Sequence, residues 1–99
     1  MSHRLRLTRA AADDLQRLFD FLAAHDLPLA VQAREAIAQA FDFMAAFPFA
    51  CRKADPSRPW LREMVISFGR AGYVALYEID DDEIITVLAV RHQREDDRY

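Results

Sequence analysis

Residues 84–90 constrain the fold of this chain more than any other segment. The run Ile-Ile-Thr-Val-Leu-Ala-Val is apolar at nearly every position, which is typical of a strand covered on both faces. We therefore expect a strand from Glu83 to His92 in the interior of a sheet. This strand continues directly into Arg91 and His92, so it places charged groups where the sheet meets water.

Two further strands are expected before it, one from Trp60 or Leu61 to Phe68 and one from Tyr73 to Ile79. A tight connection containing two glycines, Gly69–Gly72, joins the first of these strands to the second. Three aspartates at 80–82 form the next turn. Strands joined by such short turns pair antiparallel.

The N-terminal half predicts a short strand and two helices. His3–Thr8 alternates charged and apolar residues, as a half-buried strand does. Thr8 is a plausible N-cap for a helix over Arg9–His25, and Pro28 suits the first turn of a second helix that ends near Phe47. Apolar residues repeat at helical spacing in both segments: Ala11, Leu15, Leu18, Phe19 and Leu22 in the first, and Ala33, Ile37, Ala40, Phe41 and Met44 in the second, with Phe43 and Phe47 widening the stripe.

The predicted order of elements is therefore β-α-α-β-β-β. This order indicates an α+β fold, with an N-terminal helical hairpin packed on one face of a mainly antiparallel three- to four-stranded sheet. The pairing partner of the first strand is not determined by the sequence pattern.

Length and composition limit the classes of protein. A chain of 99 residues with 53% hydrophobic and 29% charged residues is expected to form one globular domain over residues 1–99. The single cysteine, Cys51, excludes an internal disulfide and suggests a reducing cytoplasm. No apolar segment approaches the ~20 residues that a membrane helix needs. The three histidines lie far apart without a partner at ligand spacing, so we expect neither a metal nor a cofactor.

The charge balance argues against general attraction to nucleic acid. The formal net charge is −3, which disfavours a protein that depends on phosphate backbones for binding. All basic residues except Lys53 are arginines. The planar guanidinium favours specific contacts in interfaces, although a GC-rich genome would produce the same bias.

Several segments resemble the toxins of the RelE/ParE superfamily of bacterial type II toxin–antitoxin modules. The segments are Leu7–Leu15 (LTRAAADDL), Leu61–Met64 (LREM) followed by Gly72–Tyr77 (GYVALY), and Val87–Asp96 (VLAVRHQRED), the last of which closely resembles the end of ParE-like, plasmid-stabilisation-type toxins. The resemblance implies a cytoplasmic toxin encoded beside an antitoxin, whose flexible C-terminal segment wraps the toxin and neutralises it in a hetero-oligomer. ParE-like members poison DNA gyrase by binding, whereas RelE-like members cut messenger RNA on the ribosome.

RNA cleavage would need a base, an acid and cations around the phosphate. The candidates are Glu63 or His92 as base, His92 or Tyr99 as acid, and Arg62, Arg70 and Arg91 as phosphate clamps. Arg91 and His92 are neighbours on a strand, so their side chains point to opposite faces unless a twist or bulge intervenes. The chain also departs from RelE-like nucleases in its single lysine and its acidic balance.

Two surfaces are candidates for binding. The tail carries Arg91, Arg94, Arg98 and Tyr99, and arginine and tyrosine are enriched at interface hot spots. This tail is either a surface for gyrase or a frayed terminus. A second set, Phe43, Phe47, Phe49 and Trp60, supplies more large apolar groups than one sheet face needs, so it either completes the core or forms an exposed antitoxin-binding groove. We expect gyrase binding to be the activity, with ribosome-dependent mRNA cleavage as the alternative.

Overall fold

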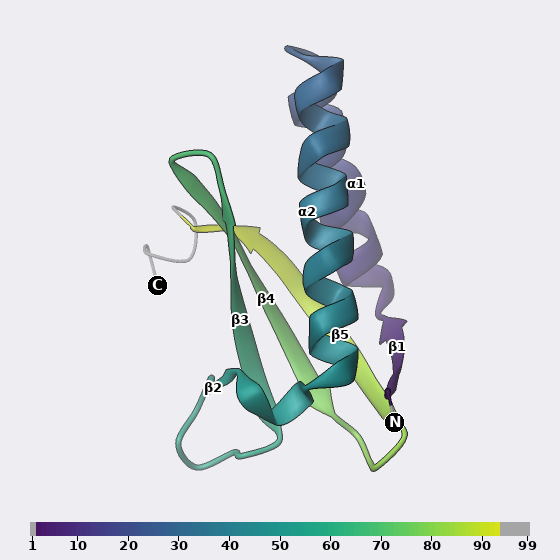
Figure 1. Cartoon of the computed structure of the whole chain (residues 1–99), viewed down its shortest axis with the longest axis vertical. Helices are drawn as coiled ribbons and strands as arrows, with labels where there is room; N and C mark the ends of the chain where they lie inside the picture. Colours follow the sequence, from purple (N-terminus) through teal and green to yellow (C-terminus); the bar gives the residue numbers. More distant parts are fainter. Residues whose placement is uncertain (1, 94–99) are drawn as a thin grey trace.

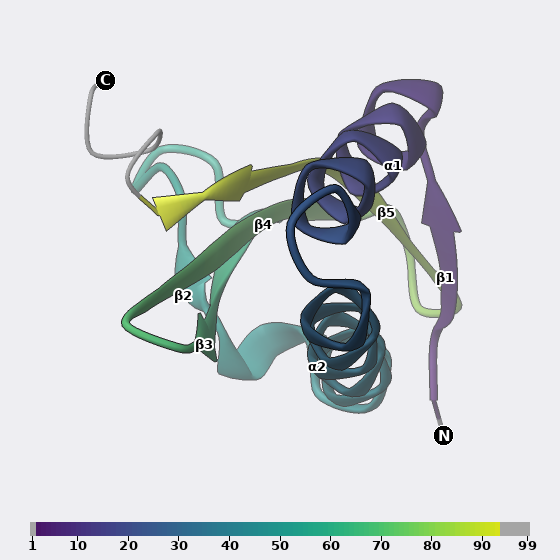
Figure 2. The same cartoon turned by 90° about the horizontal axis from the view of Figure 1, so that it is seen from above.

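The computed structural model describes residues 2–93 and combines two long helices with a five-stranded sheet. The elements follow in the order β1 (Arg4–Leu7), α1 (Arg9–Ala23), α2 (Leu27–Ala46), a short 3-10 helix η1 (Pro48–Ala50), β2 (Arg52–Lys53), β3 (Leu61–Phe68), β4 (Ala71–Ile79) and β5 (Ile84–His92). Figures 1 and 2 show α1 and α2 side by side on one face of the twisted sheet. The predicted α+β arrangement, with a helical hairpin on one face of a sheet, is confirmed.

The sheet differs from the prediction in its strand count and in one pairing. Its strand order is β1-β5-β4-β3-β2. The first strand runs parallel to β5, while the other three pairings are antiparallel. Parallel pairing is accessible to β1 because the helical hairpin provides the long crossover that parallel neighbours require. The additional strand, β2, has only two residues, too few to show the alternation by which strands are recognised in a sequence.

The core lies between the helical hairpin and the sheet. Strand β5 is flanked by β1 and β4, which confirms the interior position expected from its apolar run. The fully buried side chains with the largest volumes are Tyr77, Met44, Ile85, Val87 and Val90. The predicted stripe of α2 faces this core, but Phe43 and Phe47 do not widen it. Both are exposed, and Phe47 lies one residue beyond the end of α2.

Polar side chains at the helix starts match the predicted signals. Thr8 Oγ1 accepts a hydrogen bond from the Ala11 N–H at 3.0 Å, which caps α1. Asp26 Oδ1 accepts one from the Leu29 N–H at 3.1 Å and caps α2. Each such cap satisfies a backbone donor that the first turn of a helix leaves unpaired. No helix within residues 2–93 is long and apolar enough to cross a membrane.

Strand β5 contains a bulge that is bound to the start of α1. The register between β4 and β5 shifts by one residue at Leu88. The Thr8 hydroxyl donates to the Leu88 carbonyl at 3.1 Å, and the Val90 N–H donates to Asp14 Oδ2 at 3.0 Å. The pairing of β1 with β5 ends at Val87, so the start of α1 satisfies backbone groups of β5 beyond that point.

Candidate partner-binding surfaces

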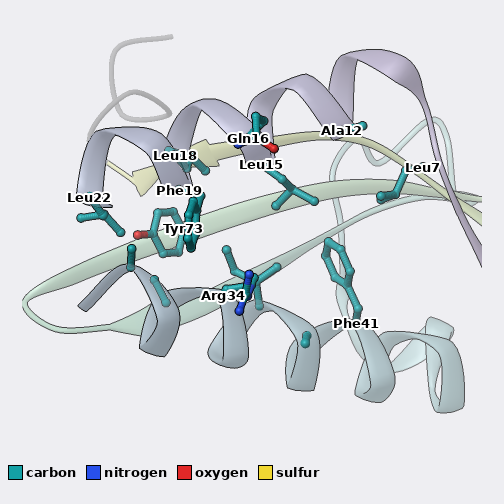
Figure 3. A pocket seen from close by; sticks show the side chains of 14 residues that line it. Leu7, Ala12, Leu15, Gln16, Leu18, Phe19, Leu22, Arg34, Phe41 and Tyr73 are labelled. Atoms are coloured by element: carbon teal, nitrogen blue, oxygen red, sulfur yellow. The ribbon is translucent and has the colours of Figure 1, made fainter. Parts of the chain in front are cut away.

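An apolar groove of about 550 Å³ lies between α1 and α2 (Figure 3). Leu15 and Phe19 line it from α1, Phe41 lines it from α2, and Tyr73 reaches into it from β4. Burial raises the pKa of the Tyr73 phenol above its ordinary value, in keeping with apolar surroundings. Arg34 spans the groove from α2 and places its guanidinium carbon 5.2 Å from the centre of the Phe19 ring.

This groove was not predicted at this position, because the sequence analysis considered an exposed groove only for Phe43, Phe47, Phe49 and Trp60. The space exists because small side chains stand where the two helices face each other: Ala12, Ala30, Ala33 and Ala38 all line the groove. Alanine at these positions removes the large side chains that would fill the space between the helices. The alternation of alanine with larger apolar residues along both helices was the available sequence signal.

The four residues predicted to contact an antitoxin reach the surface in two pairs. Their exposed fractions are 42% for Phe43, 58% for Phe47, 53% for Phe49 and 58% for Trp60. The Phe43 and Phe47 ring centres are 5.3 Å apart, and the Phe49 and Trp60 rings meet edge to face at 6.1 Å. All four belong to the C-terminal end of α2 or to the segment that follows it. We define them as the aromatic surface.

Arg62 organises the segment that carries this surface. Its guanidinium donates hydrogen bonds to three backbone carbonyls: Pro59 at 2.8 Å, Cys51 at 2.9 Å and Phe49 at 3.3 Å. It also stacks over the Phe49 ring at 5.3 Å. A side chain with these contacts holds the connection between η1 and β3 in place, so the structure gives Arg62 a structural role where the sequence suggested a phosphate clamp.

The bulge at Leu88 decides where Arg91 and His92 point. His92 pairs with Tyr73 in the ladder and meets its ring edge to face at 5.9 Å, on the side of the helices. Arg91 pairs with Val74 and is exposed on the opposite face. Without the extra residue the two side chains would exchange faces, since sides alternate along a strand. The expectation that the two residues face opposite ways is met.

The other candidates for RNA cleavage are divided between the two ends of β3. Arg70 lies in the turn between β3 and β4, near the end of the sheet where Tyr73 pairs with His92, and nearly the whole length of β3 separates it from Arg62. Glu63, the candidate base, forms an ion pair with Arg52, in which Nε and Oε1 are 2.6 Å apart. Arg62 and Glu63 thus have partners at one end of β3, while Arg91 and His92 face opposite ways near its other end. The predicted tail residues Arg94, Arg98 and Tyr99 lie outside the described residues.

No group of three or more His, Cys, Asp or Glu side chains within residues 2–93 is arranged to hold a metal ion. Cys51 is a free thiol within that range, close to the buried hydroxyl of Tyr77. Tyr77 in turn donates a hydrogen bond to the Pro48 carbonyl. These contacts connect the 3-10 helix to the sheet.

Comparison with known proteins identifies the family. The model of the ParE toxin of the type II toxin–antitoxin system parDE matches residues 5–97. The chain belongs to the ParE toxin family. The match includes both helices that line the groove and all four residues of the aromatic surface, so these features lie inside the toxin domain of this ParE-family chain.

Solved structures agree with the fold. A chain of the chromosomal ParDE toxin–antitoxin system from P. aeruginosa superposes with a TM-score of 0.72 and is 20% identical, over 92% of this chain and 96% of that chain. A chain of the RelBE2 toxin–antitoxin complex from Mycobacterium tuberculosis has a TM-score of 0.60 and is 23% identical, over 93% of this chain and 99% of that chain. No curated protein matches this ParE-family chain in sequence.

Proposed function

We propose that this ParE-family toxin acts by binding DNA gyrase on DNA and preventing the resealing of breaks, without chemistry of its own. The single observation that supports binding over catalysis is the dispersal of the candidate nuclease residues. Arg91 and His92 point to opposite faces, and Arg62 is held by three carbonyls. General acid–base catalysis needs donor and acceptor groups within hydrogen-bond reach of one substrate.

We further propose that a cognate antitoxin neutralises the toxin in the cytoplasm as a hetero-oligomer. The groove between α1 and α2 and the aromatic surface support this part of the proposal. Exposed apolar area of this kind is typical of protein–protein contact sites. An amphipathic antitoxin helix would present side chains at i, i+3, i+4 and i+7, and the groove offers an apolar bed for such a row.

The decisive experiment incubates purified toxin with gyrase, ATP and relaxed plasmid. We expect loss of supercoiling and an increase in linear DNA after protein digestion, both abolished when antitoxin is added first. Arg91→Ala is expected to reduce inhibition, because Arg91 is the described member of the predicted target surface. Arg9→Ala, which changes an exposed arginine at the start of α1, is the matched control. Unaltered supercoiling at high toxin excess would refute gyrase as the target.

Ribosome-dependent mRNA cleavage is the competing function, and its support is the RelBE2 structure, which shares the fold. A translation reaction programmed with a defined mRNA separates the two functions. Cleavage at codon positions by the wild-type toxin, lost in His92→Gln, would replace the gyrase proposal. Intact mRNA together with inhibited gyrase would support the gyrase proposal.

A further inference from the structure

A cavity of about 270 Å³ lies where β3 begins and β4 turns into β5. Its lining consists of two aromatic residues, Phe49 and Trp60, and the segment Glu78–Asp82, which contains four acidic residues and Ile79. The Phe49 and Trp60 rings meet at an interplanar angle of 72°, and more than half of each residue is exposed. We define these residues as the aromatic–acidic pocket. The volume of this pocket suits one long side chain and is too small for a helix.

Every charged residue that lines this pocket is acidic. Asp80 is balanced in part by Arg6, at 3.3 Å, and Asp81 Oδ1 accepts hydrogen bonds from two backbone N–H groups of the turn. The side-chain carboxylates of Glu78 and Asp82 have neither an ion pair nor a hydrogen bond within residues 2–93, although the backbone of Glu78 pairs in the sheet. Arg62 stacks on Phe49, and Arg58 lines an adjoining pocket with Trp60 and Glu78. The acidic residues of the aromatic–acidic pocket still outnumber the arginines beside it, next to an exposed indole ring.

The lining indicates an organic cation and not a metal ion. The carboxylates do not converge as metal ligands do within the described range, and aromatic rings are not ligands for hard cations, which prefer several oxygens. Carboxylates beside a tryptophan face are suited to a cation that is also flat and partly apolar. Phosphate groups are repelled by the same charges, which argues against nucleic acid as the ligand.

The chain's own arginines show that this chemistry operates in the protein. Arg34 stacks on Phe19 and Arg62 stacks on Phe49, at 5.2 Å and 5.3 Å. A guanidinium can stack on a ring and donate two parallel hydrogen bonds to a carboxylate at the same time. We propose that the aromatic–acidic pocket binds an arginine side chain of a partner polypeptide. That this polypeptide is the antitoxin rests on the proposed function, because Phe49 and Trp60 belong to the aromatic surface.

Trp60 is the only tryptophan of the chain, so its fluorescence reports on the pocket directly. Titration of the full chain with N-acetyl-arginine amide is expected to give a saturable change in emission, whereas the uncharged N-acetyl-citrulline amide gives none. Asp82→Asn and Glu78→Gln should each weaken binding about fivefold, the value for unit charges roughly 4 Å apart in water. Glu35→Gln, an exposed carboxylate on α2, should leave binding unchanged.

Equal responses to the arginine and citrulline compounds would overturn the proposal, as would a loss of affinity in Glu35→Gln as large as in Asp82→Asn. If the pocket variants fail to fold by circular dichroism, the comparison of the two compounds on the wild-type chain decides alone. The partner is tested separately, by measuring the affinity of the cognate antitoxin for the Asp82→Asn toxin. Unchanged affinity would overturn the assignment to the antitoxin, while the gyrase assay remains independent of both results.

Discussion

The hydrogen bond between Asp14 and the bulged strand provides the sharpest test of how this fold is held. The Val90 N–H donates to Asp14 Oδ2 at 3.0 Å, and Val90 is completely buried. Asp14→Ala leaves this donor without a partner in the core. An unpaired buried amide costs about 1–3 kcal/mol.

Smaller effects of Asp14→Ala largely cancel. Loss of the surface ion pair with Arg17, at 3.0 Å, adds at most about 0.5 kcal/mol. The higher helix propensity of alanine offsets it by a similar amount. The expected decrease in the free energy of unfolding is therefore about 2 kcal/mol, which lowers the melting temperature by about 8–16 °C in a domain of this size.

Urea unfolding followed by far-UV circular dichroism measures this change. Asp13→Ala is the matched control, because Asp13 occupies the same first turns of α1 but is exposed. It shares the interaction with the helix dipole, and its loss should cost no more than about 0.5 kcal/mol. Asp14→Asn keeps an acceptor oxygen, so its free energy of unfolding should lie between those of Asp14→Ala and Asp13→Ala. If Asp14→Ala is as stable as Asp13→Ala, the bond to β5 does not hold the bulge, and the reasoning fails.

Three further predictions concern the sheet and the segment before it. Gly72→Ala should lower the free energy of unfolding by roughly 3 kcal/mol or more, because the φ of Gly72 is +144° and a Cβ would lie 2.1 Å from the Ile66 carbonyl oxygen. Gly69→Ala, with φ +61° and no atom within 4 Å of a Cβ, should lower it by only about 1 kcal/mol. Equal urea midpoints for the two variants would contradict this prediction. Burial raises the pKa of Tyr77 above the value of about 10 expected in the unfolded chain. The stability that neutral Tyr77 contributes is therefore complete below pH 10 and decreases as the pH rises further. Urea midpoints measured between pH 8 and 11 should fall in the wild type and fall less in Tyr77→Phe. A lysine in Arg62→Lys cannot reproduce three carbonyl contacts and a stacked ring. Limited proteolysis should therefore cut the connection before β3 faster in this variant than in the wild type. Equal cleavage rates would refute the structural role of Arg62.

Much of the fold could be predicted because it is encoded locally. The apolar run of β5, the Thr8 cap and the helical spacing of the α2 stripe each depend on residues close together in the chain. Periodicity determines which side chains are buried, and burial of one face determines that the helices cover the sheet. The resemblance to ParE-like toxins lies in the same segments and is confirmed by the family match over residues 5–97.

The candidate sites depended on the tertiary structure. The bulge at Leu88, bound by Thr8 and Asp14 from the other end of the chain, decides that Arg91 faces outward and His92 faces the helices. A shift of one residue leaves local periodicity almost unchanged, yet it reverses every side chain beyond it.

The remaining surfaces also depended on the tertiary structure. The sequence by itself determined that this chain builds a helical hairpin on a sheet and has more large aromatic residues than that core needs. Only the tertiary structure decided that alanines leave a groove between the helices, that Arg62 is held by three carbonyls, and that Trp60 and Asp82 line the same pocket. These features arise where segments distant in the chain come into contact. The spacing of residues within one segment does not specify which other segment will pack against it.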